Sequence, residues 1–342
     1  MNIKKIAVNI ALLCVSVFVG LILVEVGLRI FQPGKGGELI TITFSDNFAK
    51  KDEILGFTGI PFAEGTSYNC ETKVRYKHNS RGYRDREHAV EKEEGVYRVL
   101  VLGDSFVWGV GVGQESVLTY KLEDMNDNLE VINVSFPRWA TVNEYRYYET
   151  EGIYYKPDML VVVFFVSNDL IGNGAYEMSG YEGWEPPKPE KKEYKFLSYK
   201  YIQDHSRIYR RWKRMRRDFK VKQGMKPVLT EYDPLTIEWK ATMKWIDKFK
   251  SLTDKEGSKL VFVLAPGREQ FFIPKGRYKP QIMLTDYLRE KHVAYLDLLP
   301  VFEKTREKNN KNWGYFNYDG HWNELGHKKA AEEIYTYIKE NM

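Results

Sequence analysis

Apolar residues are distributed unevenly along the chain, and the first long apolar run lies near the N-terminus. Residues 6–24 form 19 consecutive uncharged positions, of which only Asn9 and Ser16 are polar. A helix of this length nearly spans the ~30 Å hydrocarbon core of a membrane, because each residue adds about 1.5 Å. Lys4 and Lys5 precede the run. The positive-inside rule therefore keeps the N-terminus in the cytoplasm and places the rest of the chain outside.

A cleaved signal peptide is the alternative interpretation of this segment. The run is long for the apolar part of a signal peptide, and no A-x-A-like cleavage site follows it. Lipidation of Cys14 would need a small residue before it, but Leu13 stands there. The sequence therefore favours an uncleaved signal anchor at 1–33, with Cys14 inside the bilayer and unable to pair with Cys70.

Beyond residue 96, short apolar runs alternate with amphipathic stretches. The runs are rich in Val, Leu and Phe and lack polar alternation, which is typical of strands covered on both faces. Five strands are predicted, at 98–102, 129–134, 159–166, 259–264 and 293–298. Amphipathic helices are predicted at 235–252 and 324–338. This alternation predicts a three-layer α/β/α sandwich with a mostly parallel five-stranded sheet in a flavodoxin-like arrangement.

Two other segments flank or interrupt this pattern. Residues 34–95 have the character of an N-terminal extension of short strands and loops, before a domain at 96–342. An insertion at about 172–232 includes a strongly basic stretch at 207–219, whose apolar positions follow helical spacing. These positions are Ile208, Trp212, Met215 and Phe219. Docking onto an anionic membrane or polymer and ordinary packing of a surface helix are the two interpretations.

The amino-acid composition excludes several classes of protein and of function. Charged residues make up 29% and hydrophobic residues 43% of the 342 residues, which is typical of a globular protein. The net charge of +5 is spread along the chain and is too weak to indicate a nucleic-acid partner. Two cysteines provide neither a disulfide framework nor a cysteine-rich zinc site. No metal or organic cofactor is implied.

Candidate chemistry lies where the predicted strands end, because ligands of parallel sheets bind at the carboxyl ends of the strands. Gly103, Asp104 and Ser105 follow the first strand. Ser105 suits a nucleophile, although Asp and Ser also favour turns and helix N-caps. Asn168 follows the third strand, where it could donate to an oxyanion or cap the next turn.

A histidine precedes the last predicted helix in the sequence Asp319-Gly320-His321. His321 is a candidate general base, and Asp319 could hold its other ring nitrogen. Asp297, at the end of the fifth strand, is a second candidate for this orienting carboxylate. The remaining histidines show no comparable grouping and form no metal set; they are His78, His88, His205, His292 and His327.

Together these strand-end motifs resemble the SGNH (GDSL-like) hydrolase superfamily over residues 97–342. The single span and an N-S-R-G-Y-R stretch before G-D-S-F are similar to membrane-anchored bacterial members. The resemblance implies that Ser105 is the nucleophile, His321 the base and Asp319 the third member of a triad. It also implies an oxyanion hole formed by Asn168 and by the backbone N–H groups of Ser105 and Arg138.

Three departures from the family pattern stand beside this resemblance. Arg138 occupies the position of the usual glycine in the second block, and its side chain could crowd the pocket or bind an anionic substrate. Val166 and Ser167 stand where the third block usually has a glycine. One residue, rather than the commoner two, separates Asp319 from His321, which leaves the assignment of the acid open.

The resemblance predicts a membrane-anchored serine esterase of SGNH type, single-pass, with its catalytic domain periplasmic or extracellular. Its substrate would be an acylated small molecule or glycan, with acetyl on a cell-surface glycan as the first expectation. Envelope proteins that process polysaccharides are the partners this function would imply. Two alternatives stay open: an O-acyltransferase using the same site, and a non-catalytic envelope or glycan-binding protein.

Overall fold

The computed structural model describes residues 3–31, 48–68, 71–166, 168–179, 206, 208–209, 212, 236–272, 279–309, 312–317 and 319–342. A five-stranded sheet forms the centre of the fold, and all its neighbouring strands run parallel. Its order is β6-β5-β7-β8-β9. The strands are β5 (Tyr97–Gly103), β6 (Leu129–Ser135), β7 (Met159–Phe165), β8 (Lys259–Ala265) and β9 (Ala294–Asp297). The predicted sheet is confirmed, and its strand ends differ from the prediction by at most one residue.

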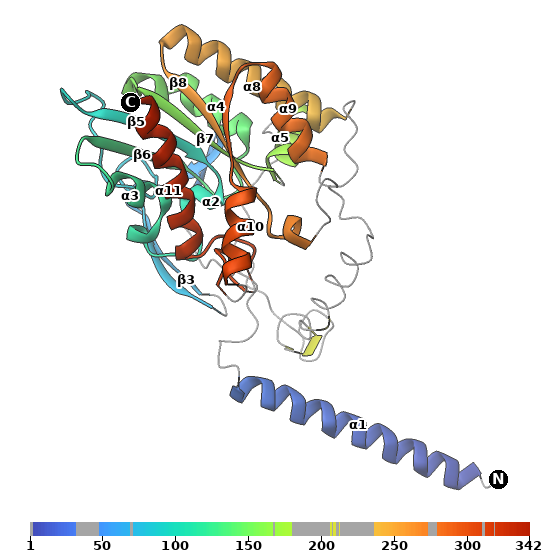
Figure 1. Ribbon diagram of the computed structural model, residues 1–342. Coiled ribbons are helices and arrows are strands. Elements are labelled where there is room, and N and C mark those ends of the chain that lie inside the picture. The colour runs from blue at the N-terminus through green and yellow to red at the C-terminus, as the bar shows by residue number, and fades with distance from the viewer. Residues whose placement is uncertain are drawn as a thin grey trace.

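Helices cover both faces of this sheet, so the predicted three-layer fold is confirmed (Figure 1). One face packs against α4 (Thr141–Thr150), α5 (Asn168–Ser179), α8 (Ile237–Glu256) and α9 (Lys279–Glu290). The other packs against α2 (Ser105–Trp108), α3 (Leu118–Glu123), α10 (Leu299–Lys308) and α11 (Glu324–Asn341). Short 3-10 turns are η1 (Gln114–Ser116), η2 (Gly152–Tyr155) and η4 (Arg268–Phe272). Alternate strand residues face the two layers, which explains the continuous apolar runs.

Helix α8 shows how local signals set the ends of an element. The side chain of Thr236 accepts a hydrogen bond from the Trp239 N–H, which makes Thr236 the N-cap. Gly257 ends the helix in the left-handed conformation, at φ 76°. The helix therefore runs four residues beyond its predicted end at 252, because the glycine, rather than the last apolar position, terminates it.

Two antiparallel hairpins occupy the described part of the N-terminal extension. They pair β1 (Ala49–Asp52) with β2 (Gly56–Gly59), and β3 (Glu64–Tyr68) with β4 (Lys73–Lys77). Apolar side chains of the extension join those of the main domain: Phe57 of β2 and Tyr83, which follows β4, pack in the core on the α4 side of the sheet. Tyr76 packs against Trp108 of α2. The division of the chain into an extension and a domain at residue 96 stays a prediction.

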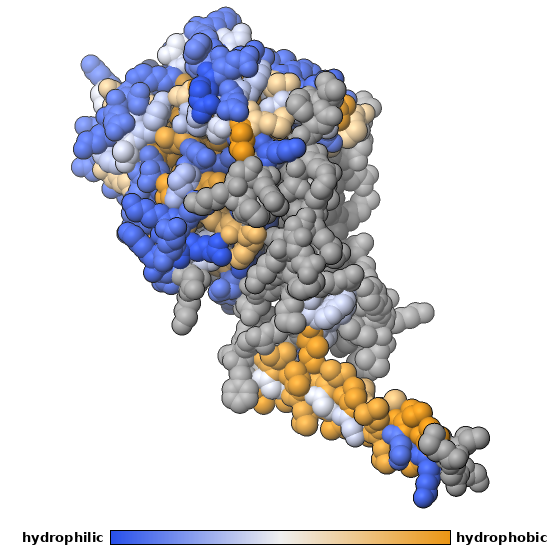
Figure 2. All heavy atoms as spheres, turned by 45° about the vertical axis from the view of Figure 1, so that its right-hand side comes forward, coloured by the Kyte–Doolittle hydropathy of each residue, from blue (hydrophilic) through white to orange (hydrophobic). Residues whose placement is uncertain are grey.

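Helix α1 (Ile3–Phe31) contains the apolar run near the N-terminus. Its stretch Val8–Leu28 has a mean hydropathy of 2.6 over 21 residues, and none of it is buried within the protein. Figure 2 shows apolar side chains along the visible side of this helix. Among the described residues it is the one helix long and apolar enough to cross a membrane. Its length and composition suit either a membrane span or a signal sequence.

A buried ionic cluster around His88 links the extension to β6. Nδ1 of His88 lies 3.0 Å from Oε1 of Glu130, and Nε2 lies 3.1 Å from Oδ2 of Asp85. Burial alone would lower the pKa of His88, but the two carboxylates outweigh it and raise the pKa to about 9. The charged histidine is therefore part of the folded structure at neutral pH.

This cluster predicts a specific pH dependence of stability. A raised folded-state pKa stabilises the protein fully below the unfolded value of about 6.5, and this contribution is lost as pH rises through about 9. We expect His88→Gln to lower the unfolding free energy by on the order of 3 kcal/mol at pH 6, and by much less at pH 10. Urea unfolding of both proteins at the two pH values measures this difference. An equal loss at both values would contradict the charged state of His88.

Candidate active site

The nucleophile candidate lies in a tight turn at the end of β5. Asp104 caps α2, because its Oδ1 accepts a hydrogen bond from the Phe106 N–H at 2.8 Å. A Cβ atom on Gly103 would come within 2.3 Å of Cγ2 of Val107, so only glycine fits between the strand and the helix. Ser105 is consequently the first residue of α2, with its side chain partly exposed at the sheet edge.

Ser105, His321 and Asp319 lie in one hydrogen-bonded chain. Nε2 of His321 is 2.8 Å from Oγ of Ser105, and Nδ1 is 2.6 Å from Oδ1 of Asp319. The same Oδ1 accepts a bond from the backbone N–H of His321 at 3.0 Å. The separation of one residue between Asp319 and His321 is therefore compatible with the geometry of a triad.

Burial and the charge of each partner shift the pKa values of Asp319 and His321. The Asp319 side chain is 4% exposed and that of His321 is 20% exposed. Burial lowers the pKa of His321, but the Asp319 carboxylate raises it more, so the net pKa lies above the ordinary value of 6.5. Burial raises the pKa of Asp319, whereas its bonds to His321 lower it below the ordinary value. The pair thus favours an ionised Asp319 beside a basic His321.

Asp297, the second candidate for the orienting acid, has other partners. Its Oδ1 accepts from the Leu299 N–H at 2.9 Å at the start of α10, and from Nε2 of Gln281. These bonds place Asp297 in the β9–α10 connection. Asp319 is therefore the carboxylate that the structure brings to His321.

Three hydrogen-bond donors lie at the ends of neighbouring strands. The register pairs Gly103 of β5 with Ser135 of β6 and with Val163 of β7. Asn168 begins α5 after β7, and its Nδ2 donates one bond to Oδ2 of Asp104 at 2.8 Å. The second hydrogen of this amide stays available to a ligand. The N–H groups of Ser105 and Arg138 have no acceptor among the described residues.

Arg138, the residue in place of a glycine, has an unusual backbone. Its φ is 75°, in the left-handed region that side chains other than glycine rarely adopt, and its side chain is exposed. The backbone at this position thus has a conformation that glycine adopts freely, although the residue there is an arginine. Its side chain forms no ion pair with a described residue.

The strain at Arg138 predicts opposite effects of two substitutions. Arg138→Gly should raise the unfolding free energy by up to about 1 kcal/mol, because relief of the left-handed strain outweighs the flexibility that glycine adds to the unfolded chain. Arg138→Val should lower it by about 1 to 2 kcal/mol, because a β-branched residue tolerates this conformation least. Urea denaturation compares the two variants. Equal destabilisation by both would contradict the backbone strain.

The N-S-R-G-Y-R stretch contributes a supporting residue that sequence reasoning did not single out. Arg84 is completely buried and donates from Nη1 to the carbonyls of Trp108 and Gly109, at 2.8 and 2.6 Å. Its Nη2 donates to the Val112 carbonyl at 2.6 Å. It thus holds the end of the helix that begins with Ser105. The sequence pointed to this stretch through the family resemblance, but it gave no indication of what Arg84 does.

Buried carboxylates lie beneath the donors. Asp104, Glu144 and Asp169 are all fully buried, and burial raises the pKa of each. Asp169 accepts from the Phe165 N–H at 2.7 Å, next to Asn168. Both carboxylate oxygens of Glu144 have no hydrogen-bond partner among the described residues. Burial and the negative charges of Asp169 and Asp104 raise the pKa of Glu144 well above its ordinary value, which favours its neutral form.

The remaining predicted features have structural roles or lie outside the described residues. His327 is buried, and its Nδ1 accepts from the Leu118 N–H. His78 packs against Phe48 with 3.9 Å between ring centroids. No group of three His, Cys, Asp or Glu side chains among the described residues is arranged so that it could hold a metal ion. His205, Ser167, Cys70, most of the insertion at 172–232 and most of the basic stretch at 207–219 lie outside them.

Comparison with known proteins gives structural similarity alone. A scan against protein families finds no match, and a search of curated proteins finds none. The chain is similar to a lipolytic protein of the G-D-S-L family from Desulfitobacterium hafniense, at a TM-score of 0.40 and 12% identity. The alignment covers 70% of this chain and 98% of that one.

Two further solved structures are similar to a comparable degree. A lipase/acylhydrolase from Enterococcus faecalis has a TM-score of 0.42 and 12% identity, over 72% of this chain and 97% of that one. A psychrotrophic esterase from Pseudoalteromonas sp. has a TM-score of 0.41 and 13% identity, over 71% and 97%. We base the function on the geometry of the site, because similarity at this level carries no information about the reaction.

Proposed function

We propose that this protein is a serine esterase with a Ser105–His321–Asp319 triad. The observation that carries the proposal is the continuous hydrogen-bonded chain, with 2.8 Å between Ser105 and His321 and 2.6 Å between His321 and Asp319. A nucleophile within reach of a base, which a carboxylate orients in turn, is the arrangement that activates a serine hydroxyl. This geometry favours an enzyme over the alternative of a non-catalytic envelope or glycan-binding protein.

The reaction follows from these positions. Oγ of Ser105 attacks the ester carbonyl while Nε2 of His321 takes its proton. The resulting oxyanion accepts hydrogen bonds from the N–H groups of Ser105 and Arg138 and from Nδ2 of Asn168. His321 then returns the proton to the departing alcohol, which leaves the acyl group on Ser105. Water, deprotonated by His321, attacks this acyl-enzyme, and the carboxylic acid departs with Ser105 restored.

Asp104 has a supporting role in this scheme. By accepting one hydrogen of the Asn168 amide, it directs the other hydrogen toward the oxyanion position. The negative charge of Asp104 also raises the pKa of His321 and so favours its protonated form. A carboxylate fixed there would thus stabilise the imidazolium formed during the attack.

We further propose a membrane-anchored protein whose ester substrate carries a small acyl group, with acetyl on a cell-surface glycan as the first candidate. The apolar helix α1 and the family resemblance support this narrower statement. In the alternative reaction, a sugar hydroxyl instead of water attacks the same acyl-enzyme, and the acyl group is transferred to the sugar.

Ester hydrolysis by the full-length protein tests the proposed function. We expect the detergent-solubilised protein to hydrolyse nitrophenyl acetate faster than longer-chain esters and to release acetate from acetylated polysaccharides. A fluorophosphonate probe should label Ser105, because it reacts with activated serines. Addition of a sugar acceptor separates hydrolysis from transfer by their products. Absence of both turnover and labelling would overturn the esterase assignment.

The orientation across the membrane is a separate prediction. Lys4 and Lys5 should hold the N-terminus in the cytoplasm, so alkaline phosphatase fused after Met342 should be active, because this enzyme folds only outside the cytoplasm. A cytoplasmic reporter at the same position should be inactive, and Lys4→Glu/Lys5→Glu should reduce the asymmetry. The reverse pattern of reporter activities would contradict the proposed compartment.

A further inference from the structure

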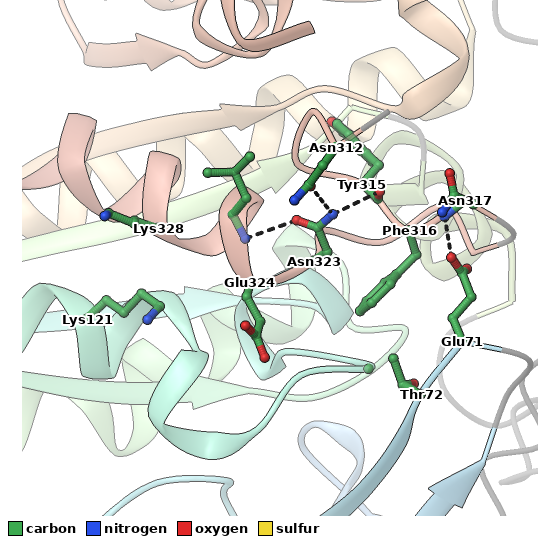
Figure 3. Close-up of a pocket in the computed structure, with 12 residues that line it drawn as sticks. Glu71, Thr72, Lys121, Asn312, Tyr315, Phe316, Asn317, Asn323, Glu324 and Lys328 are labelled. Atoms are coloured by element: carbon green, nitrogen blue, oxygen red, sulfur yellow. Dashed lines mark hydrogen bonds between the residues drawn. The ribbon is translucent and has the colours of Figure 1, made fainter. Parts of the chain in front are cut away.

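Glu71, two residues before β4, lies against the loop that carries Asp319 and His321. Oε1 of Glu71 accepts a hydrogen bond from the Asn317 N–H at 2.7 Å, and Oε2 accepts one from the Asp319 N–H at 3.3 Å. Figure 3 shows this carboxylate directed at Asn317, at the edge of a hollow of about 530 Å³. One side chain from the extension thus holds two backbone groups of a loop 246 residues further along the chain.

This loop depends on such contacts for its shape. At its base Tyr315 and Trp322 form an isolated antiparallel bridge, and the Phe316 N–H donates to the His321 carbonyl at 3.1 Å. The described residues beyond this base belong to neither a helix nor a strand until α11 begins. Besides Glu71, Arg268 holds this part of the loop, by donating from Nη1 to the Asn317 carbonyl at 2.6 Å.

The bonds of Asp319 show why its backbone position matters. Oδ1 of Asp319 bonds to the ring and to the backbone N–H of His321, the residue that it orients. Oδ2 is buried without a hydrogen-bond partner among the described residues. The hydrogen-bond partners of this carboxylate among the described residues belong to its own loop, so its position follows that of the loop backbone. Glu71 holds the N–H of that backbone.

We propose that Glu71 is a positioning residue for the reaction. Its carboxylate fixes the loop so that Asp319 stays within hydrogen-bond distance of Nδ1 of His321. The kinetic consequence rests on the proposed esterase function, since displacement of a catalytic group by about 1 Å can cost about 10²-fold in rate. Through Glu71, the hairpin β3–β4 becomes part of the active site.

Three variants of the full-length protein test this role. Glu71→Ala removes both acceptors. Glu71→Gln keeps one acceptor oxygen but presents an NH₂ group that cannot accept from the second N–H. Glu64→Ala is the matched control, because Glu64 lies on β3 of the same hairpin and pairs with Arg75 and Lys77 at the surface.

We expect Glu71→Ala to lower kcat for nitrophenyl acetate by about 10- to 100-fold with KM and the melting temperature close to wild type. Glu71→Gln should lose less, and Glu64→Ala should match the wild type. If Glu71→Ala does not fold, kcat and the melting temperature of Glu71→Gln are compared with those of the wild type instead. Unchanged kcat in a folded Glu71 variant, or a loss of kcat that only follows a loss of folding, overturns the proposal.

A spectroscopic measurement separates this proposal from the esterase assignment. The Nδ1 proton of His321, bonded to Asp319, should give a low-field proton NMR resonance in the wild type. We expect this resonance to weaken or shift in Glu71→Ala and to persist in Glu64→Ala and in Ser105→Ala. The measurement needs no substrate, so it tests Glu71 even if the wild type hydrolyses no ester. An identical resonance in the wild type and in folded Glu71→Ala overturns the positioning role.

Discussion

Ser105→Ala will abolish ester hydrolysis while leaving the fold intact. The hydroxyl of Ser105 is the only atom of this residue in the hydrogen-bonded chain with His321, and its removal leaves no nucleophile to form the acyl-enzyme. The side chain is partly exposed, so the loss of one oxygen removes little packing. We expect turnover of nitrophenyl acetate to fall by at least about 10³-fold, with an unchanged circular dichroism spectrum and melting temperature.

Ser258→Ala is the matched control for this variant. Ser258 lies just before β8, at the opposite end of the sheet from the site, and its hydroxyl donates to the Pro157 carbonyl. We expect this variant to keep wild-type turnover. If purified Ser105→Ala retained wild-type activity and fluorophosphonate labelling, another residue would be the nucleophile and the triad assignment would be wrong.

Asp319→Asn should also cause a large loss of activity. The amide can still bond to Nδ1 of His321, but by donating its hydrogen it would hold the ring in the wrong tautomer, with the proton on Nε2 facing Ser105. In a well-studied serine protease this change costs about 10⁴ in turnover. We expect a loss of similar size here. Any residual activity should have its pH midpoint shifted downward, because the carboxylate that raises the pKa of His321 is removed.

Asp297→Asn provides the comparison within the same sheet edge. Asp297 bonds to Gln281 and to the Leu299 N–H, so its substitution should affect the start of α10 more than the reaction. We expect this variant to keep most of its turnover and to lose some stability. A larger loss of activity in Asp297→Asn than in Asp319→Asn would reverse the assignment of the orienting acid.

The sequence by itself determined the layers of the fold and the position of the candidate nucleophile. Continuous runs such as 159–166 are set by burial on both faces of a strand, a property that each residue carries locally. Gly103 and Ser105 could be placed at a strand end because a strand followed by a turn is a pattern of neighbouring residues. Helix and strand ends were less accurate, since caps such as Gly257 override the apolar periodicity.

The choice between Asp319 and Asp297 was decided by tertiary structure. Both residues are acidic and lie near the sheet edge, and only the folded loop shows which carboxylate reaches His321. The left-handed conformation of Arg138 was equally invisible, because arginine gives no local signal for a positive φ.

The contacts of Arg84 and Glu71 also arise only from packing of distant segments. Arg84 reaches carbonyls 24 to 28 residues away, and Glu71 reaches N–H groups 246 and 248 residues away. Hydrophobic periodicity reports which face of an element is buried, but not which side chain of another segment will meet it. The sequence thus determined the chemistry available at the sheet edge, and the tertiary structure decided which residues hold that chemistry in place.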